Sequence, residues 1–162
     1  MNGVDAGNLA VAVALTYLLG FERDLRGAAA GDRVFALIGA GAGLIGIIAS
    51  HGAPNALAGA ITGIGFIGGG LVFRQPAGKM EVVTGITTAS AIFAAAAIGA
   101  TAGEGHLFLA TVGTALALFV LEIRHIHWLS FLDGKRWAGR FDSDQSTSVV
   151  PDGDDPGPER DK

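Results

Sequence analysis

The sequence predicts an all-α polytopic membrane protein, a bundle of about five transmembrane helices. Only 16% of its 162 residues are charged and 50% are hydrophobic, whereas about a quarter of a soluble domain is usually charged. Two long stretches carry no Asp, Glu, Lys or Arg: residues 34–73 and residues 82–103. A bilayer span needs about 20 such residues. We therefore expect a membrane bundle rather than a soluble enzyme.

Five apolar segments can be drawn. The first, Leu9–Phe21, is short unless it extends back through Asn8 and Asp5. The second to fifth segments are Val34–Ala49, Ala56–Phe73, Val82–Ala102 and Leu107–Ile123, and only a few residues separate the fourth from the fifth. We expect residues 1–126 to form the transmembrane bundle.

Two further segments follow the bundle. Residues 127–141 place four aromatic side chains beside three basic ones, which is typical of an amphipathic segment at the membrane interface. Residues 142–162 are rich in Pro, Gly, Asp and Ser and poor in apolar residues, so we expect a disordered acidic tail.

The basic residues indicate an orientation. All eleven Lys and Arg fall in residues 22–33, in residues 74–81 or after the fifth span, and none falls before the first span, in residues 50–55 or in residues 103–106. The positive-inside rule then places the N-terminus outside and the C-terminus in the cytoplasm of a multi-pass inner-membrane protein. An odd number of spans agrees with this orientation.

Several kinds of chemistry are disfavoured. The chain has no Cys, which excludes disulfides and Cys-ligated metals, and no basic stripe suggests nucleic acid. Gly63-Ile-Gly65-Phe-Ile-Gly68 matches a dinucleotide-binding pattern, but such a pattern needs a soluble strand–turn–helix unit. His51 and His106 are isolated on the outer side, so we expect solvated loop histidines. We expect no cofactor and no enzymatic activity.

Glycine pairs four residues apart predict close helix packing, because small residues let helix backbones approach in lipid. The spacing alone does not distinguish contacts within one chain from contacts in a homo-oligomer. The glycines of these motifs are Gly39, Gly43, Gly59, Gly63, Gly65 and Gly69.

Charged residues, threonines and successive glycines lie at the predicted cytoplasmic ends of spans one to four, and therefore at the same depth in the membrane. Glu22 closes the first span and Arg33 opens the second, so we expect the two side chains to pair near the lipid boundary. The alternatives are interfacial ion pairs that only anchor helix ends and hydroxyls bonded to their own helix. The residues of this predicted cluster are Glu22, Arg23, Arg33, Gly68, Gly69, Gly70, Thr84, Thr87 and Thr88.

Ordered motifs occur along the predicted spans: Gly20-Phe21-Glu22-Arg23-Asp24, Gly31-Asp32-Arg33, Gly63-Ile64-Gly65-Phe66-Ile67-Gly68-Gly69-Gly70, Gly85-Ile86-Thr87-Thr88-Ala89-Ser90, and Ala97-Ile98-Gly99 to Gly103. In their order and spacing, which cover about residues 15–121, they resemble the MgtC/SapB family of membrane proteins. In two places the chain departs from the family pattern: Val34-Phe35 replace a usual Thr-His, and Phe93 stands near a common Trp. We expect a short member without the ACT-like domain of longer ones.

The resemblance implies a role in adaptation to low magnesium and, in pathogens, in survival inside host cells (virulence). It also implies a non-catalytic protein that modulates a partner membrane complex, such as the F-type ATP synthase. The alternative is a small ion transporter or a magnesium-transport accessory protein. Apart from Asp5, the spans lack the carboxylates that Mg²⁺ prefers, although backbone carbonyls at the triple glycine could serve.

Overall fold

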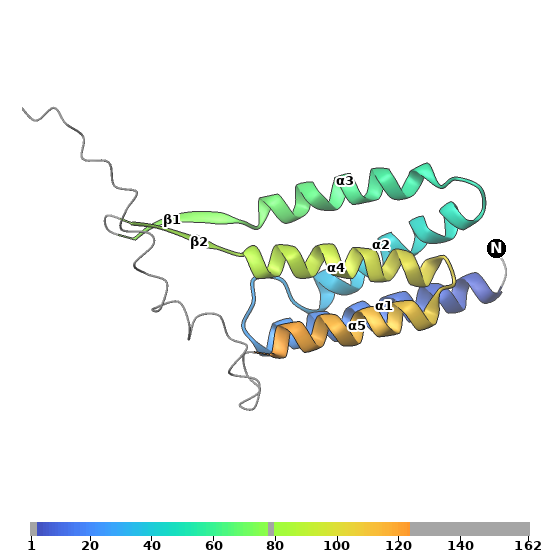
Figure 1. Cartoon of the computed structure of the whole chain (residues 1–162), viewed down its shortest axis with the longest axis horizontal. Coiled ribbons are helices and arrows are strands. Elements are labelled where there is room, and N and C mark those ends of the chain that lie inside the picture. The colour runs from blue at the N-terminus through green and yellow to red at the C-terminus, as the bar shows by residue number, and fades with distance from the viewer. Residues whose placement is uncertain (1–2, 78–79, 124–162) are drawn as a thin grey trace, which may run out of the picture. The chain divides into compact units, whose positions relative to one another are not determined.

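A computed structural model describes residues 3–77 and 80–123, and it contains five helices in this part of the chain (Figure 1). The predicted segments 127–141 and 142–162 lie outside the described residues. One structural unit covers Met1–Leu121. The helices are α1 (Gly3–Leu25), α2 (Asp32–Ser50), α3 (Asn55–Gly70), α4 (Ile86–Gly103) and α5 (Leu107–Glu122).

The number of helices is confirmed, and the largest difference in length is at the start of α1. This helix has 23 residues and begins six residues before the predicted Leu9. Asp5 lies in its first turn, where a carboxylate is favoured by the helix dipole. Asn8 is buried, so the polar residues at this end belong to the packed helix rather than to a tail.

A short β-hairpin connects α3 and α4, so the all-α prediction is incomplete. Strands β1 (Phe73–Ala77) and β2 (Met80–Thr84) pair antiparallel, with Phe73 opposite Thr84. The sequence interpretation had joined Val82 to the fourth span because it is apolar. The β-branched run Val82-Val83-Thr84 suits a strand equally well. Gly85, with φ +87°, then turns the chain into α4, a conformation that favours glycine.

Helices α1, α2 and α4 pack together as the centre of the bundle (Figure 1). Its largest fully buried side chains are Phe35, Leu19, Ile92 and Thr16. The Thr16 hydroxyl donates to the Ala12 carbonyl oxygen at 2.8 Å, so this buried polar group is satisfied within its own helix.

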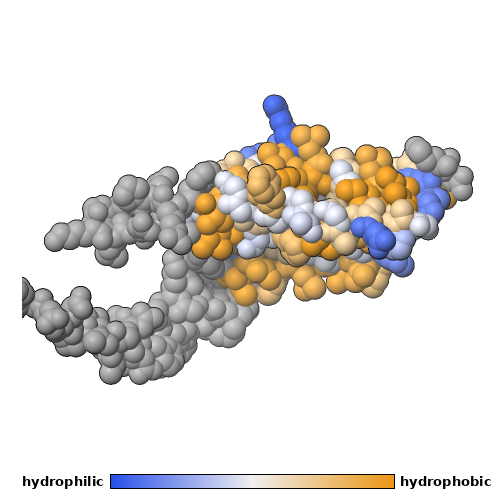
Figure 2. All heavy atoms as spheres, turned by 90° about the horizontal axis from the view of Figure 1, so that it is seen from above, coloured by the Kyte–Doolittle hydropathy of each residue, from blue (hydrophilic) through white to orange (hydrophobic). Residues whose placement is uncertain are grey.

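Helices α3 and α5 lie outside this centre. Helix α3 packs against α4 and α2 but buries only Gly68, while α5 buries Ala110 and Thr114. Large apolar side chains therefore stay on the surface: Phe66 is 87% exposed and Phe108 84%. Hydrophobic residues dominate the described part of the face in Figure 2. Among the helices of the described residues, three are long and apolar enough to cross a membrane, namely α1, α2 and α4, and α5 is a shorter apolar helix.

Candidate functional site

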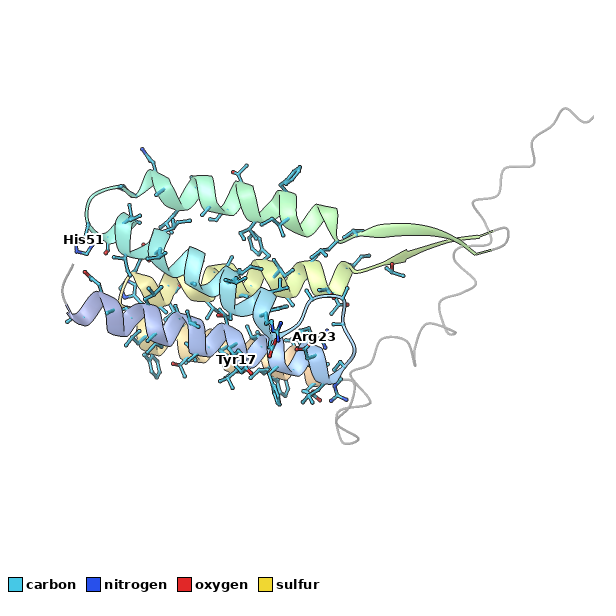
Figure 3. All side chains as sticks on the ribbon, turned by 180° about the vertical axis from the view of Figure 1, so that it is seen from behind. Tyr17, Arg23 and His51 are labelled. Atoms are coloured by element: carbon cyan, nitrogen blue, oxygen red, sulfur yellow. The ribbon has the colours of Figure 1, made fainter. Side chains whose placement is uncertain are left out.

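The buried ion pair of the bundle joins two adjacent residues near the end of α1. Arg23 donates from Nε to Glu22 Oε2 at 2.6 Å and from a terminal nitrogen to Glu22 Oε1 at 2.8 Å. Both side chains are 9% exposed, and Arg26, one turn later, places its Nε 3.6 Å from the same carboxylate. Two parallel hydrogen bonds make this a bidentate, charge-assisted contact. Figure 3 shows Arg23 on α1, close to the start of α2.

The predicted pairing of Glu22 with Arg33 is wrong. Within the described part of the chain, no hydrogen bond or ion pair links these two side chains, because Arg23 and Arg26 take the carboxylate. Arg33 is exposed, and only its backbone N–H is engaged, donating to Asp32 Oδ1 at 2.6 Å. The guanidinium of Arg33 therefore stays available at the start of α2.

Asp24 connects the motif at the end of α1 with the Gly31-Asp32-Arg33 motif at the start of α2 through a hydrogen bond. Its carboxylate accepts the Asp32 N–H at 3.0 Å across the α1–α2 turn, which satisfies one of the donors left open at the start of a helix. The same carboxylate occupies the space where a Cβ of Gly31 would lie. A Cβ on Gly20 would come within 2.7 Å of Phe35 Cβ. The glycines of both motifs thus let the end of α1 and the start of α2 touch.

The remaining residues of the predicted cluster are spread over different surfaces. Gly68 is buried beside Ala89, whereas Gly69 and Gly70 face open space. Thr88 is buried, and Thr84 is exposed. Thr87 lines a cavity of about 300 Å³ between α1, α4 and α5 together with Leu19 and Val120. A functional role for the cluster therefore stays a prediction.

Close packing depends on a partly different set of glycines from the predicted one. A Cβ on Gly99 would lie 2.9 Å from the Gly39 carbonyl oxygen, and one on Gly103 2.9 Å from Gly43 Cα. Gly46 faces the Ala100 backbone in the same way. Two Gly-x-x-x-Gly pairs, one on α2 and one on α4, therefore bring these backbones into contact. Sequence reasoning had placed Gly39 and Gly43 here but not Gly46, Gly99 or Gly103.

The predicted packing glycines of α3 make no such contact. A Cβ would meet no atom within 4 Å at any of the four positions. Three of them lie around the exposed Phe66, whereas Gly63 lines the groove between α2 and α3. We call the set around Phe66 the outward face of α3, and contact between copies or with another protein stays a prediction for it. Its residues are Gly59, Gly65, Phe66 and Gly69.

At the opposite end of the bundle, His51 lies close to Asp5. His51 Nε2 lies 3.8 Å from Asp5 Oδ2, and its Nδ1 is 2.7 Å from the Ile47 carbonyl oxygen. Figure 3 shows His51 at the end away from Arg23. His51 is exposed as expected but is not isolated, while His106 is exposed. No group of three or more His, Asp or Glu among the described residues is placed to hold a metal ion.

Spanning-length apolar helices with apolar side chains on their outside define a helical membrane protein. The chain belongs to the MgtC family, whose model matches residues 9–127. The match covers all five helices except the beginning of α1, so the resemblance found in the motifs is confirmed.

Relatives from several bacteria agree with this family. The chain is 35% identical over 120 residues to "Putative magnesium transporter YhiD" of Escherichia coli K12, covering 66% of this chain and 54% of the relative. It is 30% identical over 156 residues to Protein MgtC of Brucella abortus, covering 92% and 63%. It is 34% identical over 140 residues to Protein SrpB of Synechococcus elongatus, covering 75% and 77%.

The chain spans about half the length of the first of these relatives. No solved structure matches the chain.

Proposed function

We propose that this chain is a non-catalytic, multi-pass protein of the bacterial inner membrane that acts in adaptation to low magnesium by modulating a partner membrane complex. The F-type ATP synthase is the proposed partner. The observation that supports a partner is the outward face of α3, where three glycines flank a phenylalanine that is 87% exposed. Small residues let another helix approach closely in lipid, and an aromatic side chain can fill its grooves.

The test uses ATP-driven proton pumping in inverted membrane vesicles that contain the ATP synthase. Adding the wild-type protein is expected to lower the pumping rate at least twofold. Gly65→Leu is expected to abolish the effect, because leucine blocks the approach to the outward face of α3. The added Cβ itself would meet no atom within 4 Å, so the fold is expected to be kept. Gly7→Leu, the same change at an exposed position of α1, serves as control. Equal pumping with and without wild-type protein would contradict the proposal.

Magnesium transport is the second candidate, and the name of the Escherichia coli relative favours it. Proteoliposomes separate the two functions. Uptake of Mg²⁺ by vesicles that contain only this protein, above that of empty vesicles, would favour transport. A regulator is expected to leave uptake at the background level while it still changes proton pumping.

The proposed orientation places the N-terminus outside and the C-terminus in the cytoplasm. A reporter that is active only in the cytoplasm is expected to be active when fused after Gly78, in the connection between the two strands. The same reporter fused at Pro54, between α2 and α3, is expected to be inactive. The opposite pattern of activities would reverse the proposed topology.

A further inference from the structure

An apolar groove of about 530 Å³ runs between α2 and α3. Its volume lies within the range of about 300–1,000 Å³ that small-molecule sites occupy. All ten residues of its lining are apolar or glycine, and the residues that the argument uses are Val34, Leu37, Gly41, Ile45, Ile64 and Ile67. A neighbouring cavity between α3 and α4, which shares Ala42, Ala60 and Ile64 with the groove, differs because Thr101 and Glu104 contribute to its lining.

The groove has the length of one lipid leaflet. On α2 it extends from Val34 to Ile45, which at about 1.5 Å per residue is about 16 Å. Half of the hydrocarbon core of a bilayer measures about 15 Å. The groove would therefore accommodate hydrocarbon from the headgroup level to the membrane centre.

A cation stands at the mouth of the groove. Arg33 immediately precedes Val34, the first lining residue, and its side chain is exposed. The neighbouring carboxylates are engaged, since Asp24 accepts the Asp32 N–H and Asp32 accepts the Arg33 N–H. Within the described residues, no carboxylate pairs with the Arg33 guanidinium, and guanidinium forms bidentate contacts with phosphate.

We propose that the α2–α3 groove binds one acyl chain of an anionic phospholipid whose phosphate contacts Arg33. The apolar lining excludes polar ligands, the length matches one leaflet, and the charge at the mouth selects the headgroup. This site is separate from the outward face of α3 and does not depend on the proposed partner.

The test is native mass spectrometry of the full chain, released from detergent with added phosphatidylglycerol or phosphatidylcholine. Wild-type protein is expected to retain one phosphatidylglycerol at least fivefold more strongly than phosphatidylcholine. Gly41→Leu is expected to lower retention of both lipids at least fivefold, because the leucine side chain fills the groove. The fold is expected to be kept, since the added Cβ would meet no atom within 4 Å. Arg33→Gln is expected to remove the preference for phosphatidylglycerol only.

Gly7→Leu, which adds the same side chain on α1 away from the groove, is expected to bind like wild type. Wild-type retention by Gly41→Leu would overturn the groove as the site. Equal retention of the two lipids by wild type would overturn the contact with Arg33. A change from dimer to monomer in Gly41→Leu would show that a second copy occupies the groove, and would also overturn the proposal.

Discussion

Gly46→Ala is expected to lower the free energy of unfolding by about 1–3 kcal/mol, the usual cost of overpacking a close-packed interior. A Cβ at Gly46 would collide with the Ala100 carbonyl group, and that carbonyl belongs to the α4 backbone. A backbone carbonyl cannot change rotamer as a side chain can, so α2 and α4 must move apart. Gly46→Leu is expected to prevent folding. Thermal unfolding in detergent, followed by far-UV circular dichroism, measures the change.

The matched control is Gly41→Ala, five residues earlier on the same helix. A Cβ at Gly41 would meet no atom within 4 Å, and alanine is the better helix former by about 1 kcal/mol. Its unfolding midpoint is therefore expected to equal or exceed that of the wild type. Equal midpoints for Gly46→Ala and Gly41→Ala would show that the α2–α4 contact is looser than the structure has it.

Glu22→Gln is expected to cost about 3–5 kcal/mol of stability, because it leaves a buried guanidinium without its counter-charge. Arg23→Gln is expected to cost less, since Arg26 remains 3.6 Å from the Glu22 carboxylate. Growth in low magnesium is expected to fall in the same order. Thermal unfolding and complementation, with membrane levels measured by blot, test both parts.

Three further variants separate the pair from its surroundings. The double variant Glu22→Gln, Arg23→Gln is expected to be more stable than Glu22→Gln alone, because no unpaired charge is left. Arg33→Gln is expected to keep wild-type stability, since its side chain is exposed. His106→Ala, exposed at the opposite end, should be silent. A Glu22→Gln protein that unfolds at the wild-type temperature would rule out a stabilising role for the pair.

The apolar segments predicted the five helices because long runs without charge mark helices that contact apolar surroundings, and α5 differs from its prediction by one residue. The hairpin was missed because hydropathy does not distinguish Val82 in a strand from Val82 in a span. Hydropathy indicates that a segment is excluded from water, but it does not indicate whether the segment pairs with another strand.

The site was harder to predict than the fold. Glu22 was expected to pair with Arg33 because the two residues end and begin consecutive spans across a short loop. The structure instead pairs Glu22 with Arg23 beside it, although neighbours on a helix usually point about 100° apart. Glycine spacing failed for a related reason. Gly39-x-x-x-Gly43 and Gly59-x-x-x-Gly63 have the same pattern, yet only the first faces another helix. Which side of a helix faces inward is fixed by its neighbours and not by its own spacing.

The helices differ in length, and this difference has a consequence for the surrounding bilayer. At about 1.5 Å per residue, the 23 residues of α1 measure about 34 Å, while the 16 residues of α3 and of α5 measure about 24 Å each. A hydrocarbon core of about 30 Å is thicker than α3 or α5. In the proposed topology, where all five helices span the membrane, lipids beside α3 and α5 compress, and such hydrophobic mismatch costs a fraction of a kcal/mol per Å. Neighbouring proteins with equally short helices would relieve that compression, so local membrane thickness would favour their contact with either helix.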